Sequence, residues 1–365
     1  MFRIEMLPAG QGDCLWIEYG KPESPYRILI DGGTAHSYEH LRRRIESLPP
    51  RRRRFELLII THLDADHIGR ALELLDDLDD LNLHFRDVWF NGWDQIAPDA
   101  LGFYDAKEFS RRLANGINEG RLKWNDAFAG KAAVVEETED VTLPLRKLRG
   151  GMHLTLLSPT KTQLVRLREK WPEALREAGL LPGRSRAEKK KLRQIPGALG
   201  GSTIDVEALL ETKFRADHSR PNGSSIAVLA EFDGKSCLLT GDAFATTLAK
   251  NLRRLLAERG NDGHRFPLNA IKLPHHGSRG NVSAELIDLI KCRRYLFSTN
   301  GERTEHPDEE SVARVIKHAG PKAQLFFNYQ TKFNEIWNDG DLIDFYEYRV
   351  KFCKPTESGF LRVEL

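Results

Sequence analysis

The run FELLIITH, residues 55–62, is the feature that most constrains the fold. Only Glu56 interrupts its apolar residues before Thr61 and His62. A strand with a near-continuous apolar run is buried on both faces, so its sheet needs a covering layer on each side. The sequence therefore predicts an α/β architecture.

An amphipathic helix is expected directly after this strand. Apolar residues recur there at helical spacing: Ile68, Ala71, Leu72, Leu75 and Leu78. Such spacing gives a helix one apolar face. The segment THLDADHIG, residues 61–69, is thus predicted to form a strand-to-helix turn that carries two histidines and two aspartates.

The rest of the chain repeats this alternation of strands and helices. YRILIDGG and MHLTLLSP are predicted strands, and SSIAVLAEFDGKSCLLTGD is a predicted hairpin, because FDGK contains an Asp-Gly turn signal. Helices are expected at 244–260, 283–292 and 309–320. Both halves run strand, strand, polar turn and helix, which predicts two sheets packed face to face with helices outside.

Length and composition suit one large globular domain. Of the 365 residues, 40% are apolar and 30% are charged. We predict a single domain over 1–365 with insertions at about 91–145 and 160–220, where no period is clear or the composition shifts towards Lys, Arg, Gly and Pro.

Several sequence features bear on the compartment. No run of about 18 apolar residues occurs, so no membrane span is expected. The start MFRIEMLPAG lacks the pattern of a signal peptide. Cys14, Cys237, Cys292 and Cys353 form no CxxC pair and suit reduced thiols. A cytoplasmic protein is the expectation.

Polar side chains follow the predicted strands and suggest a metal site. They are Asp31, the cluster His62, Asp64, Asp66 and His67, then Asp242, the pair His275 and His276, and His306. Imidazole and carboxylate ligands suit Zn, Mn or Fe rather than Ca. One turn cannot direct four ligands to one ion, so two neighbouring ions are predicted. Two such ions need a shared ligand, and Asp242 is the candidate bridge.

Each polar residue also has an ordinary structural explanation. Asp66 suits the N-cap of a helix, Asp242 suits a turn after glycine, and His275-His276 suits a solvated loop. Their joint occurrence after successive strands favours the metal site over these separate explanations.

These motifs resemble a known family. THLDADHIG resembles the HxHxDH signature of the metallo-β-lactamase superfamily, with Asp64 where many members carry the second histidine. GQGDCLWIEYG, ILIDGG, NGSSIAVL, LLTGDA, LPHHGS and EHP resemble, in this order, landmarks of the hydrolase domain of the bacterial DNA-uptake competence channel. Bacterial phosphorylcholine esterase shares part of the pattern. The resemblance covers residues 1–83 and about 220–318, and implies an αββα sandwich with a dinuclear site at one edge.

Carried over position by position, the resemblance implies a ligand set for two Zn²⁺ or Mn²⁺ ions. His62 and Asp64 would hold one ion, Asp66 and His67 the other, with Asp242 between them.

Further positions complete the implied site. The histidine that many relatives place before the bridging aspartate is absent, and Asn222 occupies the corresponding region. The HHGS turn would supply a ligand through His275 or His276, between which the sequence does not choose. Asp31 is expected to orient a histidine, and Asn222 and Asp31 are both candidate ligands or supporting residues.

The expected reaction is hydrolysis by a metal-bridging hydroxide. The catalytic candidates are Asp66, at one ion, and His306, as a ligand or as a donor to the leaving group. GSS at 223–225 lacks the GxSxG pattern of a serine nucleophile.

Basic segments suggest phosphodiester substrates and a nuclease. Residues 161–193 contain eleven Lys or Arg against four Glu, and Lys189, Lys190 and Lys191 are candidate nucleic-acid contacts. Arg42–Arg44 and Arg51–Arg54, with Trp89, Trp93, Trp124 and Trp171, add basic and aromatic groups that suit a nucleic acid. The alternatives are a small-molecule ester, lactone or phosphocholine-type hydrolase, which would have a closed pocket over the metals, and a catalytically silent binding module.

Overall fold

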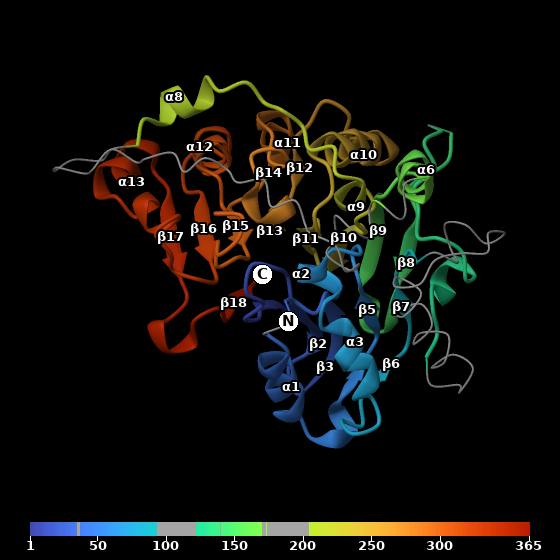
Figure 1. Cartoon of the computed structure of the whole chain (residues 1–365). Coiled ribbons are helices and arrows are strands. Elements are labelled where there is room, and N and C mark those ends of the chain that lie inside the picture. The colour runs from blue at the N-terminus through green and yellow to red at the C-terminus, as the bar shows by residue number, and fades with distance from the viewer. Residues whose placement is uncertain (35–36, 93–121, 139, 170–172, 174–203) are drawn as a thin grey trace.

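The structure, a computed structural model, describes residues 1–34, 37–92, 122–138, 140–169, 173 and 204–365. Two sheets pack face to face, and helices cover their outer faces (Figure 1). The αββα sandwich predicted from the sequence is confirmed. The two termini lie side by side, because the N–H of Leu365 donates to the carbonyl of Phe2.

The first sheet has the order β18-β1-β2-β3-β5-β7. Its strands are β1 Phe2–Met6, β2 Leu15–Lys21, β3 Ser24–Ile30, β5 Leu57–Ile59, β7 Val88–Trp89 and β18 Leu361–Glu364. The pairs β3-β5 and β5-β7 are parallel, and the other neighbours are antiparallel. Every residue of β5 is buried, as the run FELLIITH predicts.

The second sheet has the order β17-β16-β15-β13-β11-β10-β9-β8. Its strands are β8 Leu145–Lys147, β9 His153–Ser158, β10 Ala227–Phe232, β11 Lys235–Leu239, β13 Ala270–Lys272, β15 Arg294–Phe297, β16 Gln324–Phe327 and β17 Arg349–Phe352. From β11 to β17 neighbouring strands run parallel. Their carboxyl ends therefore meet at one edge, where Asp242, His275 and His306 follow β11, β13 and β15.

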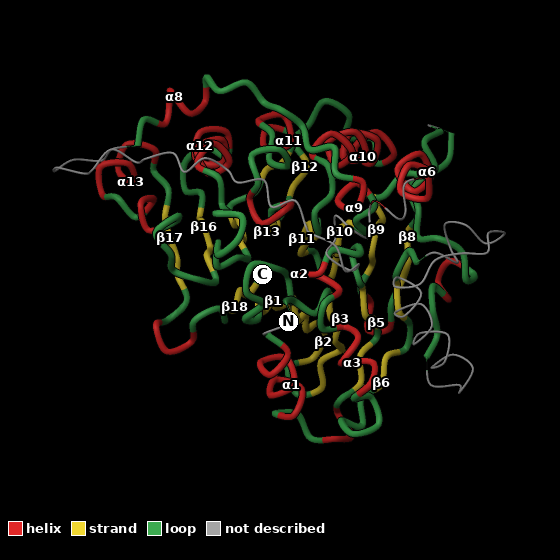
Figure 2. The backbone as a smooth tube through the Cα atoms, viewed as in Figure 1, coloured by secondary structure: helices red, strands yellow, loops and turns green. Residues whose placement is uncertain are grey.

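The helices form the two outer layers (Figure 2). They are α1 Tyr38–Glu46, α2 Ala65–Ile68, α3 Ala71–Asp76, α6 Lys161–Glu169, α8 Val206–Leu210, α9 Arg220–Gly223, α10 Ala245–Glu258, α11 Ala284–Asp288, α12 Glu309–His318 and α13 Gly340–Tyr346. Short 3-10 turns include η1 Pro50–Arg52, η2 Asp126–Phe128, η3 Arg149–Gly151, η4 Pro274–Gly277, η5 Glu335–Trp337 and η6 Pro355–Glu357. Two small parallel pairs, β4 Arg54–Phe55 with β6 His84–Phe85 and β12 Phe266–Pro267 with β14 Ile290–Lys291, lie outside the sheets.

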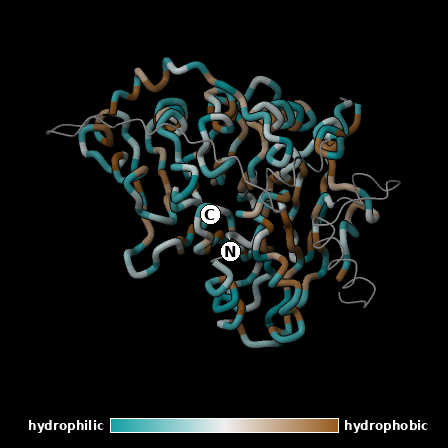
Figure 3. Tube along the Cα trace, viewed as in Figure 1, coloured by the Kyte–Doolittle hydropathy of each residue, from teal (hydrophilic) through white to brown (hydrophobic). Residues whose placement is uncertain are grey.

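Two apolar clusters hold the layers together. The larger runs between the sheets and beneath α10 to α12, and its buried members extend from Phe2 to Val363. The smaller lies between the first sheet and helices α1 and α3, and includes Leu41, Ile45 and Leu74. Brown, apolar colour accordingly follows many of the interior strands, whereas the outer helices carry much teal (Figure 3).

The prediction of a single helix after the THLDADHIG turn is wrong in one respect. The structure has two short helices, α2 and α3, with a break at Gly69 and Arg70. The carbonyl of His67 accepts a hydrogen bond from the N–H of Gly32 at 2.8 Å, so it does not continue the helical ladder towards residue 71. The hydrogen bond with Gly32 ties the end of α2 to the turn after β3.

The insertion boundaries at about 91–145 and 160–220 stay a prediction. Within the first range, Trp124 and Phe128 are buried, so the described residues around them pack with the sandwich. Trp89 is likewise buried, so Trp89 and Trp124 are core residues rather than exposed stacking groups. Trp93 and Trp171 lie outside the described residues. In the part of the chain that the structure describes, no helix is long and apolar enough to cross a membrane.

Candidate metal centre

Asp242 stands at the centre of four histidine side chains. Its Oδ1 lies 3.3 Å from Nε2 of His67 and 3.8 Å from Nε2 of His276. Its Oδ2 lies 3.8 Å from Nε2 of His62 and 3.7 Å from Nε2 of His275. Each carboxylate oxygen thus faces its own pair of imidazoles, which is the arrangement expected of a carboxylate shared by two ions.

Two aspartates of the strand-to-helix turn divide between these pairs. Oδ2 of Asp64 is 3.6 Å from Nε2 of His62, and Oδ2 of Asp66 is 3.6 Å from Nε2 of His276. Asp64 is the N-cap residue of α2 but makes no capping hydrogen bond, so its carboxylate stays free for the site. Because Asp64 is the N-cap and Asp66 lies inside α2, the explanation of Asp66 as a helix cap is wrong.

Many of the converging atoms lack ordinary hydrogen-bond partners. Among the described residues, the buried atoms without a partner include Nε2 of His62, His67 and His276, Oδ1 of Asp64 and Oδ1 of Asp242. Buried polar atoms are nearly always satisfied, so a cluster of unsatisfied nitrogens and carboxylate oxygens calls for a further partner. Divalent cations fit this donor set.

The other ring nitrogen of each histidine is held by a polar neighbour. Nδ1 of His67 is 2.8 Å from Oδ2 of Asp31, and Nδ1 of His276 is 2.8 Å from the carbonyl of Ser298. Nδ1 of His62 lies 3.0 Å from Oγ1 of Thr61. Holding Nδ1–H in this way leaves the Nε2 lone pair for a ligand.

His275 is held by amide side chains next to Asp217. Its Nδ1 lies 3.0 Å from Oδ1 of Asn281 and 3.3 Å from Nδ2 of Asn222. Asp217 accepts hydrogen bonds from both amides, at 2.7 Å from Asn222 and 3.1 Å from Asn281. Asn222 therefore supports the His275 ring, and that ring faces the same oxygen of Asp242 as His62 does.

The turn that carries both histidines is conformationally strained. His275 and His276 have φ values of 49° and 55°, and Gly277 follows at 87°. Left-handed backbone is unfavourable for residues with a Cβ, and consecutive instances persist only where packing enforces them. In this turn both imidazoles approach the Asp242 carboxylate, and the ligand choice between His275 and His276 stays a prediction. His276 is buried, so the solvated-loop explanation is wrong for that residue.

A buried ion pair behind His276 was missed from the sequence. Asp13 pairs with the ammonium of Lys272, and its Oδ1 lies 3.4 Å from Nδ1 of His276. Asp13, His67, Asp242 and His276 each offer an atom within 4.8 Å of the others. Because Asp13 is already paired and faces the Nδ1 side of His276, we infer that it orients this ring. The signal was a lysine inside an apolar strand, AIKLP.

His306 lies beside the cluster rather than within it. Its ring is 5.2 Å from that of His275 in an edge-on arrangement, and its Nδ1 is 3.5 Å from Asp308. Burial lowers the pKa of His306 despite the nearby Asp308 carboxylate, so the ring is neutral at pH 7. A neutral ring donates a hydrogen bond more readily than it transfers a proton.

Opposite charges balance one another in the metal-free site. Burial lowers the pKa of His67, but the Asp242 and Asp31 carboxylates outweigh it and raise that pKa well above its ordinary value. Burial acts likewise on His276, where Asp242 and Asp13 raise the pKa to about 9. Burial would raise the pKa of Asp242, but His67, His275 and His276 hold it well below its ordinary range. The cluster behaves as imidazolium–carboxylate pairs that a metal would replace.

Proton release gives the first test. Metal ligation requires neutral imidazole, so Zn²⁺ should displace the protons of His67 and His276. At pH 8 ordinary histidines, with pKa near about 6.5, are already neutral. Titrating Zn²⁺ into metal-free protein in a pH-stat should therefore release about two protons from these rings, with at most one more from coordinated water. Affinity should rise with pH up to about 9. A release of one proton or fewer would contradict the protonation of both rings.

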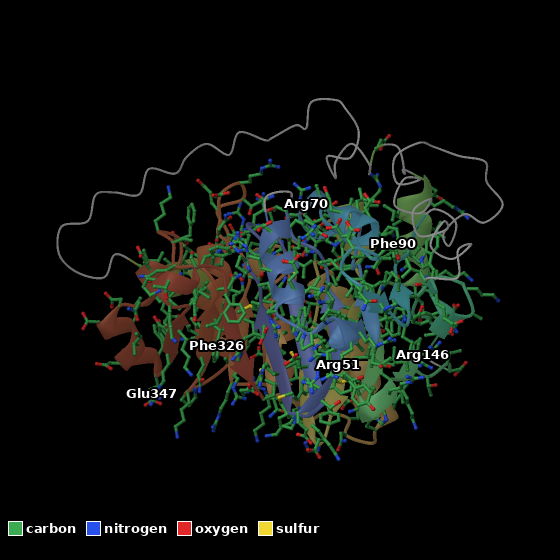
Figure 4. All side chains as sticks on the ribbon, turned by 90° about the horizontal axis from the view of Figure 1, so that it is seen from below. Arg51, Arg70, Phe90, Arg146, Phe326 and Glu347 are labelled. Atoms are coloured by element: carbon green, nitrogen blue, oxygen red, sulfur yellow. The ribbon has the colours of Figure 1, made fainter. Side chains whose placement is uncertain are left out.

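The basic segments proposed for nucleic acid are placed only in part. Lys189, Lys190 and Lys191 lie outside the described residues. Of the segments at 42–44 and 51–54, Arg42 pairs with Asp77, Arg44 pairs with Glu5, and Arg53 donates to backbone carbonyls. Arg51 lies on the exposed side of the first layer (Figure 4). Much of this charge thus stabilises the fold around α1.

Comparison with known protein families supports the same fold. A family model described as the metallo-beta-lactamase superfamily matches residues 7–299. Among solved structures, the metallo-beta-lactamase fold protein YhfI from Bacillus subtilis is 10% identical, with 99% of each chain covered and a TM-score of 0.42. Zn(2+)-bound PqqB from Methylobacterium extorquens is 12% identical, with 100% of each chain covered and a TM-score of 0.43. A mutant of CmlA beta-hydroxylase is 12% identical, covering 100% of this chain and 54% of that one, with a TM-score of 0.40. No curated protein matches.

Proposed function

The chain belongs to the metallo-β-lactamase superfamily, and on that premise we propose that it is a two-ion, metal-dependent phosphodiester hydrolase, most simply a nuclease. The observation that carries this proposal is the position of Asp242, whose two oxygens face separate pairs of imidazoles. A silent binding module would have no need of three buried histidines whose Nε2 atoms have no hydrogen-bond partner.

Each ion would have its own protein ligands. His62, Asp64 and His275 would hold the first with Oδ2 of Asp242. Divalent ions such as Zn²⁺ or Mn²⁺ would supply Lewis acidity and a nucleophile derived from water at neutral pH.

The second ion would have Asp66, His67 and His276 as its ligands, with Oδ1 of Asp242. Asp31 would keep the His67 ring in one tautomer. His306, neutral and at the edge of the cluster, would donate a hydrogen bond to the departing oxygen.

A basic hollow beside the centre favours an anionic substrate. It has a volume of about 230 Å³, and its lining includes Lys213, Arg215, Arg279 and Arg314. The hollow connects to the centre through the backbone, because the N–H of Asp217 donates to the carbonyl of Gly280, and Asp217 in turn supports His275 through Asn222 and Asn281. Phosphate groups are the natural partners of such clustered cations.

Removing two cations from this hollow tests the substrate class. Lys213 and Arg215 are exposed, and no carboxylate pairs with either among the described residues. Replacing both with alanine should raise the KM for single-stranded DNA about tenfold at low salt, because two phosphate contacts disappear. Cleavage of bis(p-nitrophenyl) phosphate should change less than about threefold, because the small diester does not reach the hollow.

The matched control removes two exposed cations, Lys21 and Arg51, that do not line the hollow. Their alanine variant should leave the KM for DNA unchanged. If both double variants behave alike, the hollow has no part in substrate binding.

The reaction itself is tested with a panel of substrates and metal-loaded protein. We expect hydrolysis of bis(p-nitrophenyl) phosphate and of single-stranded DNA, double-stranded DNA or RNA, in keeping with the competence-type resemblance. Efficient turnover of p-nitrophenylphosphorylcholine, p-nitrophenyl acetate or a lactone, without cleavage of any nucleic acid, would favour the small-molecule hydrolase instead.

A further inference from the structure

A large hollow lies at the edge of the second sheet opposite the candidate metal centre. Its volume is about 1240 Å³, and its lining includes the β10–β11 turn and the first residues of β15 and β16. The metal ligands follow the carboxyl ends of β11 and β13, whereas this hollow lies at their amino ends. β11 has five residues, so about 17 Å of strand separates the two edges.

The hollow carries a strong excess of positive charge. Six cations line it but only two carboxylates, Glu231 and Asp233. Glu231 is fully engaged by Arg259 through two hydrogen bonds of 2.8 and 2.7 Å. The remaining five cations have no carboxylate partner among the described residues: Lys235, Arg265, Lys291, Arg293 and Arg294. Like charges gathered without compensation repel one another, and an anion would relieve that repulsion.

Two of these arginines are held in place by the backbone. Arg265 donates to the carbonyls of Ile287 and His318, each at 3.2 Å, and Arg294 donates to the carbonyl of Asn269 at 3.3 Å. Neutral carbonyls fix a guanidinium without cancelling its charge. A ligand that binds to fixed guanidinium groups loses less free energy to side-chain ordering, and arginine matches phosphate oxygens in a bidentate manner.

From these observations we infer that the hollow binds a ligand with several phosphate groups. Its volume exceeds the range of about 300–1,000 Å³ that is typical for small ligands, so one phosphate would leave most cations unpaired. A nucleic-acid backbone and a free polyphosphate share this chemistry. The site is separate from the centre and does not depend on the proposed hydrolase activity.

The test reverses three exposed, unpaired cations, Lys235, Lys291 and Arg293, to glutamate in the full chain. Binding is measured with a fluorescent phosphorothioate 20-mer of single-stranded DNA, which resists cleavage, and with inorganic tripolyphosphate and ATP as competitors. The control reverses three exposed lysines that do not line the hollow: Lys131, Lys250 and Lys354.

The expected result is a loss of affinity of at least tenfold in the hollow variant and a much smaller loss in the control. For the oligonucleotide, the slope of log affinity against log salt should fall by about two, because three phosphate contacts at roughly 0.7 each are lost. Binding of tripolyphosphate or ATP alone, with the same loss in the variant, would identify a free polyphosphate as the source. No binding of any probe, or equal losses in both variants, would overturn the inference.

The measurement is independent of catalysis. Hydrolysis of bis(p-nitrophenyl) phosphate should be unchanged in the hollow variant, because no metal ligand lines the hollow. An inactive parent protein that still binds the probes through these cations would contradict the proposed function and leave the phosphate site intact.

Discussion

Replacing Asp242 with asparagine should remove bound metal and hydrolytic activity together. Asparagine keeps the shape of the side chain but supplies one neutral oxygen, so it cannot serve both imidazole pairs that face the carboxylate. Activity should fall at least about 10³-fold, beyond the roughly 10–100-fold that loss of an outer hydrogen-bond partner costs. Metal content and kcat/KM measured on the same preparation check the result.

Asp64→Asn is the matched control for this variant. Asp64 approaches only His62 and is about a quarter exposed, so its loss should weaken one ion and leave the other. We expect a smaller loss of activity, about 10–100-fold, and retention of about one ion. Similar small losses in the two variants would contradict the assignment of Asp242 as the shared ligand.

Gly12→Ala should disrupt the metal centre by a steric clash. A Cβ at Gly12 would stand 1.7 Å from the backbone carbonyl oxygen of Asp66, and backbone cannot rotate away as a side-chain end can. We expect the free energy of unfolding to fall by about 3 kcal/mol or more, at the upper end of overpacking effects. Metal affinity should fall as well, because Asp66 and His67 share the displaced turn. Chemical denaturation and metal titration measure the two effects.

Gly340→Ala provides the control, because a Cβ there would meet no atom within 4 Å. Its free energy of unfolding should change by less than about 1 kcal/mol. If Gly12→Ala lowers the free energy of unfolding by as little as Gly340→Ala does, the prediction of a steric clash at Gly12 is wrong.

The buried strands and the polar turns were predictable because their signals are local. FELLIITH specifies a strand buried on both faces, and parallel neighbours must bring their carboxyl ends to one edge. Within the second sheet, that reasoning groups Asp242 with His275 and His306, whereas His62 follows a strand of the first sheet, so its position near Asp242 depends on how the two sheets pack. The αββα layering follows from the same alternation.

The approach of His275 to Asp242, alongside that of His276, was not predictable in the same way. It depends on a left-handed turn and on Asn281, Asn222 and Asp217, which are up to 64 residues apart in the chain. The family resemblance indicated an absent histidine near Asn222, whereas the structure provides an imidazole from another strand end. The break between α2 and α3 could not be predicted for a related reason. The N–H that donates to the His67 carbonyl belongs to Gly32, which is distant in the chain.

The ion pairs and the cation clusters formed by residues far apart in the chain could not be predicted from the sequence either. The arginines near residue 44 suggested a nucleic-acid surface, but Arg44 lies over Trp16 and pairs with buried Glu5. Conversely, the cations of the two basic hollows are scattered between residues 213 and 314, apart from the short segment KCRR at 291–294. Only the fold gathers them.

Metal stoichiometry tests the two-ion centre most directly. The full chain should be purified without chelator, loaded with Zn²⁺ or Mn²⁺, desalted and analysed for metal by elemental analysis against protein concentration. We expect about two ions per chain, because the Asp242 oxygens face two sets of imidazoles and aspartates. A content of zero, or of one ion that is unaffected by Asp242→Asn, would contradict the two-ion centre.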